Sequence, residues 1–164
     1  MRVLKWLDQY FEEAVLVVFL VIMMIIMGLQ VTARYVFSSS LSWSEEITRY
    51  LFIWSGFLSA SFCIKNGVSV KIDQLVRLLP ERLFHIVKAF TYVIELIFFA
   101  YMIPFAYKYV SSAIVSKQLS PACGIPIYLI QFATIFSFSL CVFRLAEKLI
   151  LRIKTLIHLG KEAK

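Results

Sequence analysis

The sequence predicts an all-α integral membrane protein with four transmembrane helices and a short interfacial amphipathic helix between the second and the third. Composition gives the first indication: 61% of the 164 residues are hydrophobic and 16% are charged, against roughly 25% charged residues in ordinary globular proteins. The mean hydropathy is +0.84. The second indication is that residues 14–33 contain no charged side chain, over a length sufficient to cross the hydrocarbon core of a bilayer. We expect residues 1–164 to form a single membrane domain.

The first transmembrane helix is expected over residues 14–35, after a short amphipathic lead-in. Its charge-free stretch is longer than the apolar region of a secretory signal peptide, which is roughly 7–15 residues, and no small-residue cleavage site follows it. We therefore interpret this stretch as a retained helix. The second transmembrane helix is expected over residues 43–64, which again form a long, largely apolar segment.

The second half of the chain predicts one interfacial helix and two further transmembrane helices. Four apolar residues have the spacing of a helix that lies in the membrane interface with its basic residues toward the headgroups: Ile72, Leu75, Val76 and Leu79. Pro80 suits the first turn of a third transmembrane helix over residues 81–115, in which Pro104 should produce a kink. Two prolines and a glycine in residues 120–126 stop that helix. The fourth is expected over residues 127–150.

The distribution of lysine and arginine predicts the orientation of the helices. With the N-terminus in the cytoplasm, thirteen of these residues fall in cytoplasmic segments. The other four fall outside: Arg34, Arg49, Lys108 and Lys117. Because basic residues concentrate in cytoplasmic loops, we expect both termini to be cytoplasmic. The net charge of +7 therefore reflects membrane topology and contact with lipids, and no nucleic-acid partner is expected.

A charged segment leads directly into the second helix. Ser42 and Glu45 have the S-x-x-E spacing of a capping box, which satisfies two backbone amides at a helix start. Glu46 also lies in the first turn, where the helix dipole favours negative charge. Arg49 follows these two acids by four and three residues, so it can pair with either. Trp43 is expected to anchor the helix at the lipid interface.

Small residues recur every four positions along the interior of the second helix. One set contains Ser55, Ser59 and Cys63, and the other contains Gly56 and Ala60. Such spacing lets helix backbones approach closely and marks helix–helix packing in lipid. A single neighbouring helix within a four-helix unit would require only one such face. The presence of two small faces therefore favours a partner protein.

Three stretches cover most of residues 33–84: "ARYVF", "SLSWSEEITRYLFIWSGFLSASF" and "VKIDQLVRLLPERL". They resemble the small membrane subunit of TRAP (tripartite ATP-independent periplasmic) transporters. The resemblance implies a bacterial inner-membrane protein that lies beside a large membrane subunit, which moves substrate and sodium. It also implies a periplasmic binding protein that delivers an organic acid such as sialic acid or a C4-dicarboxylate.

On this interpretation the chain is a scaffold without its own substrate site, metal or cofactor. The segment that begins the second helix would form an outer rim in contact with the large subunit and with the binding protein. The residues expected at the partner interface are Trp43, Glu45, Glu46, Arg49, Ser55, Gly56, Ser59 and Ala60.

Two other classes of function were weighed against a scaffold. Glu95 is the only acid inside a predicted span, so the alternative is a self-sufficient small exporter that oligomerises around it. Pumps of that kind carry their essential glutamate in the first helix and have shorter chains. An enzyme such as a four-helix thiol oxidase would need paired periplasmic cysteines, and only Cys123 is expected on that side. We therefore do not expect an enzyme.

Overall fold

The computed structural model describes residues 2–39, 41–67 and 81–162. Four helices make up nearly all of this part: α1 (Arg2–Val36), α2 (Ser42–Asn66), α4 (Glu81–Ser116) and α5 (Ile127–Glu162). Each contains an apolar stretch that is long enough to cross a membrane: Phe11–Val36, Ser42–Asn66, Ile86–Ser116 and Ile127–Thr155. The predicted all-α membrane fold is confirmed. The predicted interfacial helix falls between α2 and α4, outside the described residues.

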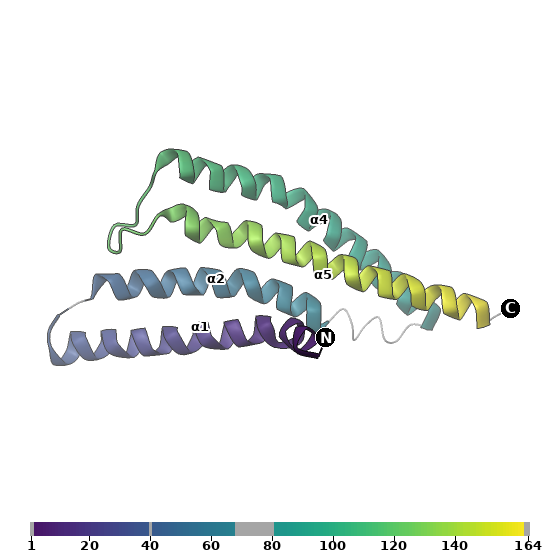
Figure 1. The fold of residues 1–164 in the computed structure, drawn as a ribbon, viewed down its shortest axis with the longest axis horizontal. Coiled ribbons are helices and arrows are strands. Elements are labelled where there is room, and N and C mark those ends of the chain that lie inside the picture. Colours follow the sequence, from purple (N-terminus) through teal and green to yellow (C-terminus); the bar gives the residue numbers. More distant parts are fainter. Residues whose placement is uncertain (1, 40, 68–80, 163–164) are drawn as a thin grey trace.

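The helices lie side by side in one layer, in the spatial order α1, α2, α5, α4 (Figure 1). Neighbours in the layer are the packed pairs: α1 contacts α2, α2 contacts α5, and α5 contacts α4. This arrangement leaves many large apolar side chains exposed, such as Met24 on α1 and Phe90 on α4, which are 67% and 66% exposed. In a bilayer such side chains contact lipid or another protein.

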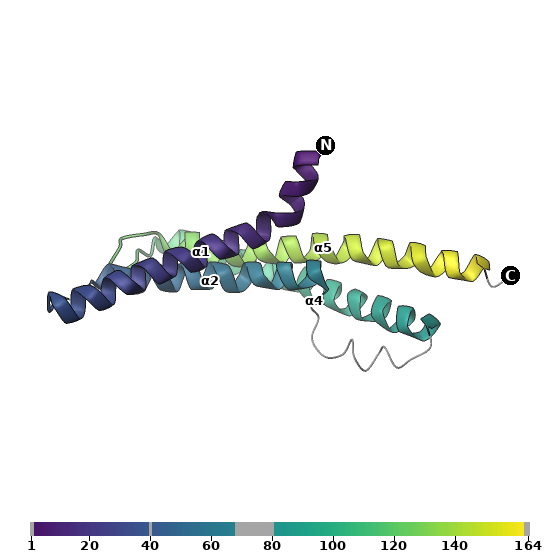
Figure 2. The ribbon, with the colours of Figure 1, turned by 90° about the horizontal axis from the view of Figure 1, so that it is seen from below.

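Two helices extend beyond their predicted limits. The predicted lead-in is continuous with the first helix, because α1 is helical from Arg2, and its N-terminal end turns out of the layer (Figure 2). α5 continues to Glu162 instead of ending at residue 150, since its basic tail consists mostly of good helix formers. α2 ends at Gly67, whose φ of 67° is the left-handed conformation that glycine adopts without strain. α4 remains helical through Pro104.

The core lies along the contact between α2 and α5. Ala133, Ser137 and Cys141 recur every four residues on α5 and are at most 1% exposed. On α2, Ser61 is also fully buried. The Ser137 hydroxyl donates a hydrogen bond across this contact to the backbone carbonyl of Phe57. Small residues therefore allow close packing here, but on a side of α2 different from the two faces expected from the sequence.

Candidate partner interface

Glu46 connects the N-terminal part of α2 to the loop between α4 and α5. One carboxylate oxygen, Oε2, accepts hydrogen bonds from the backbone amides of Ala122 and Cys123, at 2.9 and 2.8 Å. The other, Oε1, accepts one from the Tyr50 hydroxyl at 2.5 Å. Glu46 is only 7% exposed, so these charge-assisted bonds replace its hydration. The side chain therefore holds a distant loop against α2.

The loop that Glu46 binds is closed by its own backbone. The Ser120 amide donates to the Ile125 carbonyl at 2.9 Å, and the Gly124 amide donates to the Ser120 carbonyl at 3.0 Å. Gly124 has a φ of 65°, a left-handed conformation that a glycine adopts without a steric penalty. Pro121 at the tip of the loop is exposed. The turn predicted at residues 120–126 is present, and it forms an ordered surface next to the start of α2.

The capping box predicted at the start of α2 is absent. The residue at the cap position is Leu41, and no side chain caps the helix. Ser42 is already helical and exposed, and the Glu45 carboxylate instead accepts a hydrogen bond from Gln30 Nε2 of α1 at 2.6 Å. Because Ser42 lies inside the helix and Glu45 binds Gln30 of α1, these two side chains do not form the local box.

The remaining residues of the predicted rim are exposed on the same end of the molecule. Trp43 is 41% exposed, and its backbone carbonyl accepts a hydrogen bond from Cys123 Sγ at 3.6 Å. Arg49 is exposed and forms no ion pair with Glu45 or Glu46 within the part of the chain that the structure describes. Partial burial, and then the adjacent Glu46 carboxylate, raise the pKa of the Cys123 thiol. The structure thus brings α1, α2 and the loop together at the rim.

The small residues of α2 lie away from the core. Gly56 is exposed, and a Cβ atom built on it would meet nothing within 4 Å. Ser55 and Ser59 are half-buried, and their hydroxyls donate only to carbonyls of their own helix, at 2.8 and 2.7 Å. Ala60 is also half-buried. These residues leave an open strip that runs along α2 from the rim.

Comparison with known proteins decides the family. The model of the family "Tripartite ATP-independent periplasmic transporters, DctQ component" matches residues 23–155. The chain belongs to the DctQ family. It is therefore a component of a transporter and not an enzyme, and the resemblance found in the sequence is confirmed.

Three relatives show how the match extends along the chain. A putative TRAP transporter small permease protein of Haemophilus influenzae is 33% identical over 125 residues, which are 76% of each chain. The isethionate TRAP transporter permease protein DctMQ of Oleidesulfovibrio alaskensis is 29% identical over 153 residues, or 90% of this chain and 24% of that protein. The sialic acid TRAP transporter permease protein SiaT of H. influenzae is 41% identical over 54 residues, 33% of this chain and 9% of that protein. The chain thus spans only a quarter or less of the two longer relatives.

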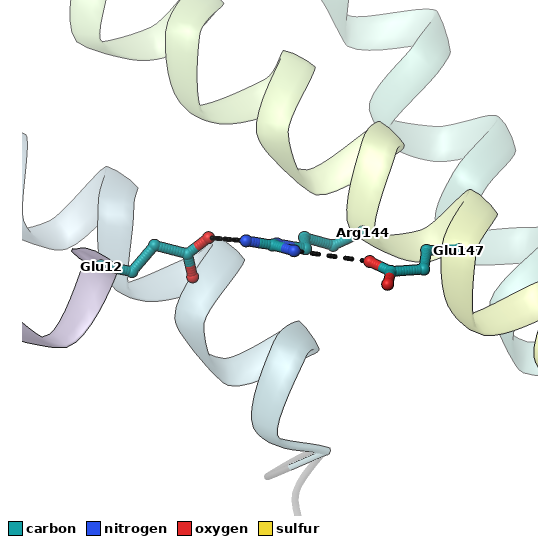
Figure 3. A network of polar contacts seen from close by, with 3 residues as sticks. All are labelled: Glu12, Arg144 and Glu147. Atoms are coloured by element: carbon teal, nitrogen blue, oxygen red, sulfur yellow. Dashed lines mark hydrogen bonds and ion pairs between the residues drawn. The ribbon is translucent and has the colours of Figure 1, made fainter. Parts of the chain in front are cut away.

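A buried ion pair in this DctQ-family chain was not expected from the sequence. Arg144 of α5 contacts Glu12 of α1, with Nε and Nη2 both 3.1 Å from Oε1 (Figure 3). Glu12 is 3% exposed and Arg144 is 7% exposed. Nη1 of Arg144 lies 3.4 Å from Oε2 of Glu147 in the next turn of α5. The pair joins two helices that are separated in the layer by α2.

Glu95, the acid expected to lie inside a span, is half-buried on α4 at the level of this pair. Its Oε2 atom is buried and has no hydrogen-bond partner among the described residues. Lys148 of α5 exerts an electrostatic attraction on it. Within residues 2–39, 41–67 and 81–162, no group of three or more His, Cys, Asp or Glu side chains is arranged to hold a metal ion.

Proposed function

We propose that the chain is the small scaffold subunit of a sodium-coupled TRAP transporter in the bacterial inner membrane. In this role it supports a large permease subunit that imports an organic acid delivered by a periplasmic binding protein. Membership of the DctQ family supports the assignment to a TRAP transporter. The names of two relatives include isethionate and sialic acid, which are organic anions. Sialic acid and C4-dicarboxylates are the substrates that we propose for the complex.

The observation that carries this proposal is the open strip on α2. The exposed residues Phe52 and Cys63 extend this strip, because they recur with Gly56 and Ser59 at helical spacing on one side of α2, and Phe52 is 67% exposed. Small side chains flanked by a large exposed aromatic favour close packing of another helix. The strip is continuous with the rim, so one partner could contact both the strip and the loop held by Glu46. We propose that this partner is the large subunit.

A bulky residue in the strip should block the partner without disturbing the fold. Gly56→Leu places its side chain in open space in the isolated chain, so we expect folding to be unaffected. It should lower co-purification of the large subunit about tenfold, because overpacking at a close helix contact is costly. Gly28→Leu is the matched control, since a Cβ at Gly28 of α1 also meets nothing within 4 Å. Equal recovery of the large subunit with both variants would contradict the interface.

The orientation of the chain is proposed from the positive-inside rule, with both termini in the cytoplasm and the rim in the periplasm. Single cysteines introduced at Ser39 and Ala122 should react with a membrane-impermeant maleimide added outside, and one at Asn66 should not. All three positions are exposed, whereas Ser120 in the same loop is only 4% exposed and is a poor labelling site. Permeabilised cells control for reactivity of the Asn66 position. The reverse labelling pattern would contradict the orientation.

One observation favours the alternative, a self-sufficient exporter: Oε2 of Glu95 has no hydrogen-bond partner among the residues that the structure describes. Under the scaffold proposal this carboxylate carries no transported proton or coupling ion. Glu95→Gln keeps the shape of the side chain and removes its charge, so uptake by the full complex should fall by less than about tenfold, the size of a modest local perturbation. Uptake is measured in vesicles together with the amount of assembled complex. Complete loss of uptake with normal assembly, or transport by the purified chain alone, would favour the exporter.

A further inference from the structure

α4 lies at one edge of the helix layer and presents an outer stripe of exposed residues there (Figure 1). Its members recur at the i, i+3, i+4, i+7 and i+8 positions of one helix face, and all are exposed: Ile97, Ala100, Tyr101, Pro104 and Phe105. The buried residues Ala106, Val110 and Ala113 lie on the other side of the helix, where α4 packs against α5. The outer stripe therefore faces away from the rest of the layer.

Tyr101 places a hydroxyl group deep in the membrane. It is the central residue of the apolar stretch Ile86–Ser116, and it is 63% exposed. Either end of that stretch is roughly 22 Å away along the helix, which exceeds half of the hydrocarbon thickness of about 30 Å. Within residues 2–39, 41–67 and 81–162, this hydroxyl has no hydrogen-bond partner. Tyrosine is typical of the membrane interface, because hydrocarbon offers its O–H group no acceptor.

A backbone carbonyl on the same stripe lacks its helical donor. α4 remains helical through Pro104, which has no N–H group to donate to the carbonyl of Ala100, four residues earlier. Ala100 and Pro104 are both exposed, so this carbonyl lies at the surface of the helix. In a membrane, backbone groups that a proline frees in this way are satisfied by neighbouring helices. The outer stripe thus carries an O–H donor and a C=O acceptor that both require a partner.

We propose that the outer stripe binds a transmembrane helix of the large subunit, and that this helix carries serine, threonine, asparagine or glutamine in its middle turns. The identity of the partner rests on the proposed function. These side chains have both donors and acceptors and form hydrogen bonds between helices in membranes, whereas acyl chains have neither. The small side chain of Ala100 lets the partner approach the carbonyl closely. The stripe is then a second contact for the large subunit, besides the strip on α2.

A second copy of the chain fits the stripe less well. In an α-helix the side chains lean toward the N-terminus, whereas the carbonyl groups point toward the C-terminus. The Tyr101 hydroxyl and the Ala100 carbonyl are therefore displaced in opposite directions along α4. Two copies inserted in the same orientation would place the donor of one copy at a different height from the acceptor of the other. Such a pair would satisfy neither group.

Removing the hydroxyl group alone tests the assigned hydrogen bond. Tyr101→Phe should raise the dissociation constant between the chain and the large subunit about threefold, which is the average contribution of a hydrogen bond between transmembrane helices. Fluorescence anisotropy of the labelled chain, titrated with the large subunit in detergent, measures this constant. Tyr107→Phe is the matched control, since Tyr107 is 67% exposed on the same helix but lies outside the outer stripe. An unchanged constant for Tyr101→Phe, or an equal rise in the control, would overturn the contact.

Photocrosslinking in the assembled complex identifies the occupant of the stripe. A photoreactive amino acid in place of Ile97 should form an adduct with a transmembrane peptide of the large subunit, which mass spectrometry identifies. An adduct with a second copy of the chain, or with lipid alone, would overturn the proposal. The same photoreactive group in place of Phe52, on the α2 strip, separates this test from that of the proposed function. An adduct with the large subunit at Phe52 and none at Ile97 would overturn only the contact at the outer stripe, and none at either position would contradict both.

Discussion

Replacing Arg144 by methionine is expected to destabilise the folded chain by about 3–5 kcal/mol, because it leaves the buried Glu12 carboxylate without its counter-charge. Glu12 is 3% exposed, and its Oε2 atom already has no hydrogen-bond partner among the described residues. Arg144 supplies both contacts to Oε1, from Nε and from Nη2, each at 3.1 Å. Without the guanidinium, Glu12 must become protonated or draw water into the helix layer. Unfolding by a denaturing detergent, followed by circular dichroism, measures the loss.

A double variant separates the ion pair from the packing of the same side chains. Glu12→Leu combined with Arg144→Met replaces the pair by apolar groups, and it should recover most of the stability lost in the single Arg144 variant. Glu13→Gln is the control, since Glu13 is the exposed neighbour on α1, and its effect should stay within about 0.5 kcal/mol. If Arg144→Met were as stable as this control, the contact between α1 and α5 would have no energetic role.

The sequence was sufficient to predict the helices because each apolar stretch carries its own signal. The stretch at residues 14–33 has no charge, and the prolines and glycine of residues 120–126 mark where a helix stops. The spatial order of the helices has no such local signal. Glu12 and Arg144 are 132 residues apart, and each could be interpreted separately as a charge at a membrane surface. The two residues can pair only because the fold brings their side chains to the same height along the helices, although α2 lies between α1 and α5.

The start of α2 shows the same limit at shorter range. The spacing of Ser42 and Glu45 predicts a capping box from four neighbouring residues. In the folded chain Glu45 binds Gln30 of α1, and Glu46 binds loop amides that lie 76 and 77 residues further along the sequence. A side chain can cap a helix only if it is not hydrogen-bonded to another group, and the tertiary structure determines whether it is. The capping and pairing partners that the spacing predicted for these acids are therefore not the groups that they bind.

Glu46→Gln is expected to release the loop between α4 and α5 from α2. The carboxylate accepts two backbone amides at one oxygen and the Tyr50 hydroxyl at the other, whereas a neutral side-chain amide has only one acceptor oxygen. Cys123 reports on the change, because its own amide is one of the two donors. In a chain in which Cys63 and Cys141 are replaced by alanine, maleimide labelling of Cys123 should become about tenfold faster or more.

The pH dependence of labelling identifies the cause of that acceleration. Partial burial and the Glu46 carboxylate raise the pKa of the Cys123 thiol, so its reactive thiolate forms only at higher pH. Removing the carboxylate and opening the loop should both lower that pKa, and the pH profile of labelling should shift toward lower pH. Glu45→Gln is the control, since its amide oxygen can still accept the hydrogen bond from Gln30. Identical profiles for the two variants would contradict the role of Glu46.

Charge reversal at Glu46 then connects the loop to the proposed partner. Glu46→Lys places a cation against two amide donors, so the loop should detach and co-purification of the large subunit should fall. Reversing Arg49 as well should not restore it, because the exposed Arg49 forms no ion pair with Glu46 in the described part of the chain. If the double reversal recovered the complex, a local charge pair on α2 would be the important contact. Continued failure with an intact α2 would support the ordered loop as the surface that the partner contacts.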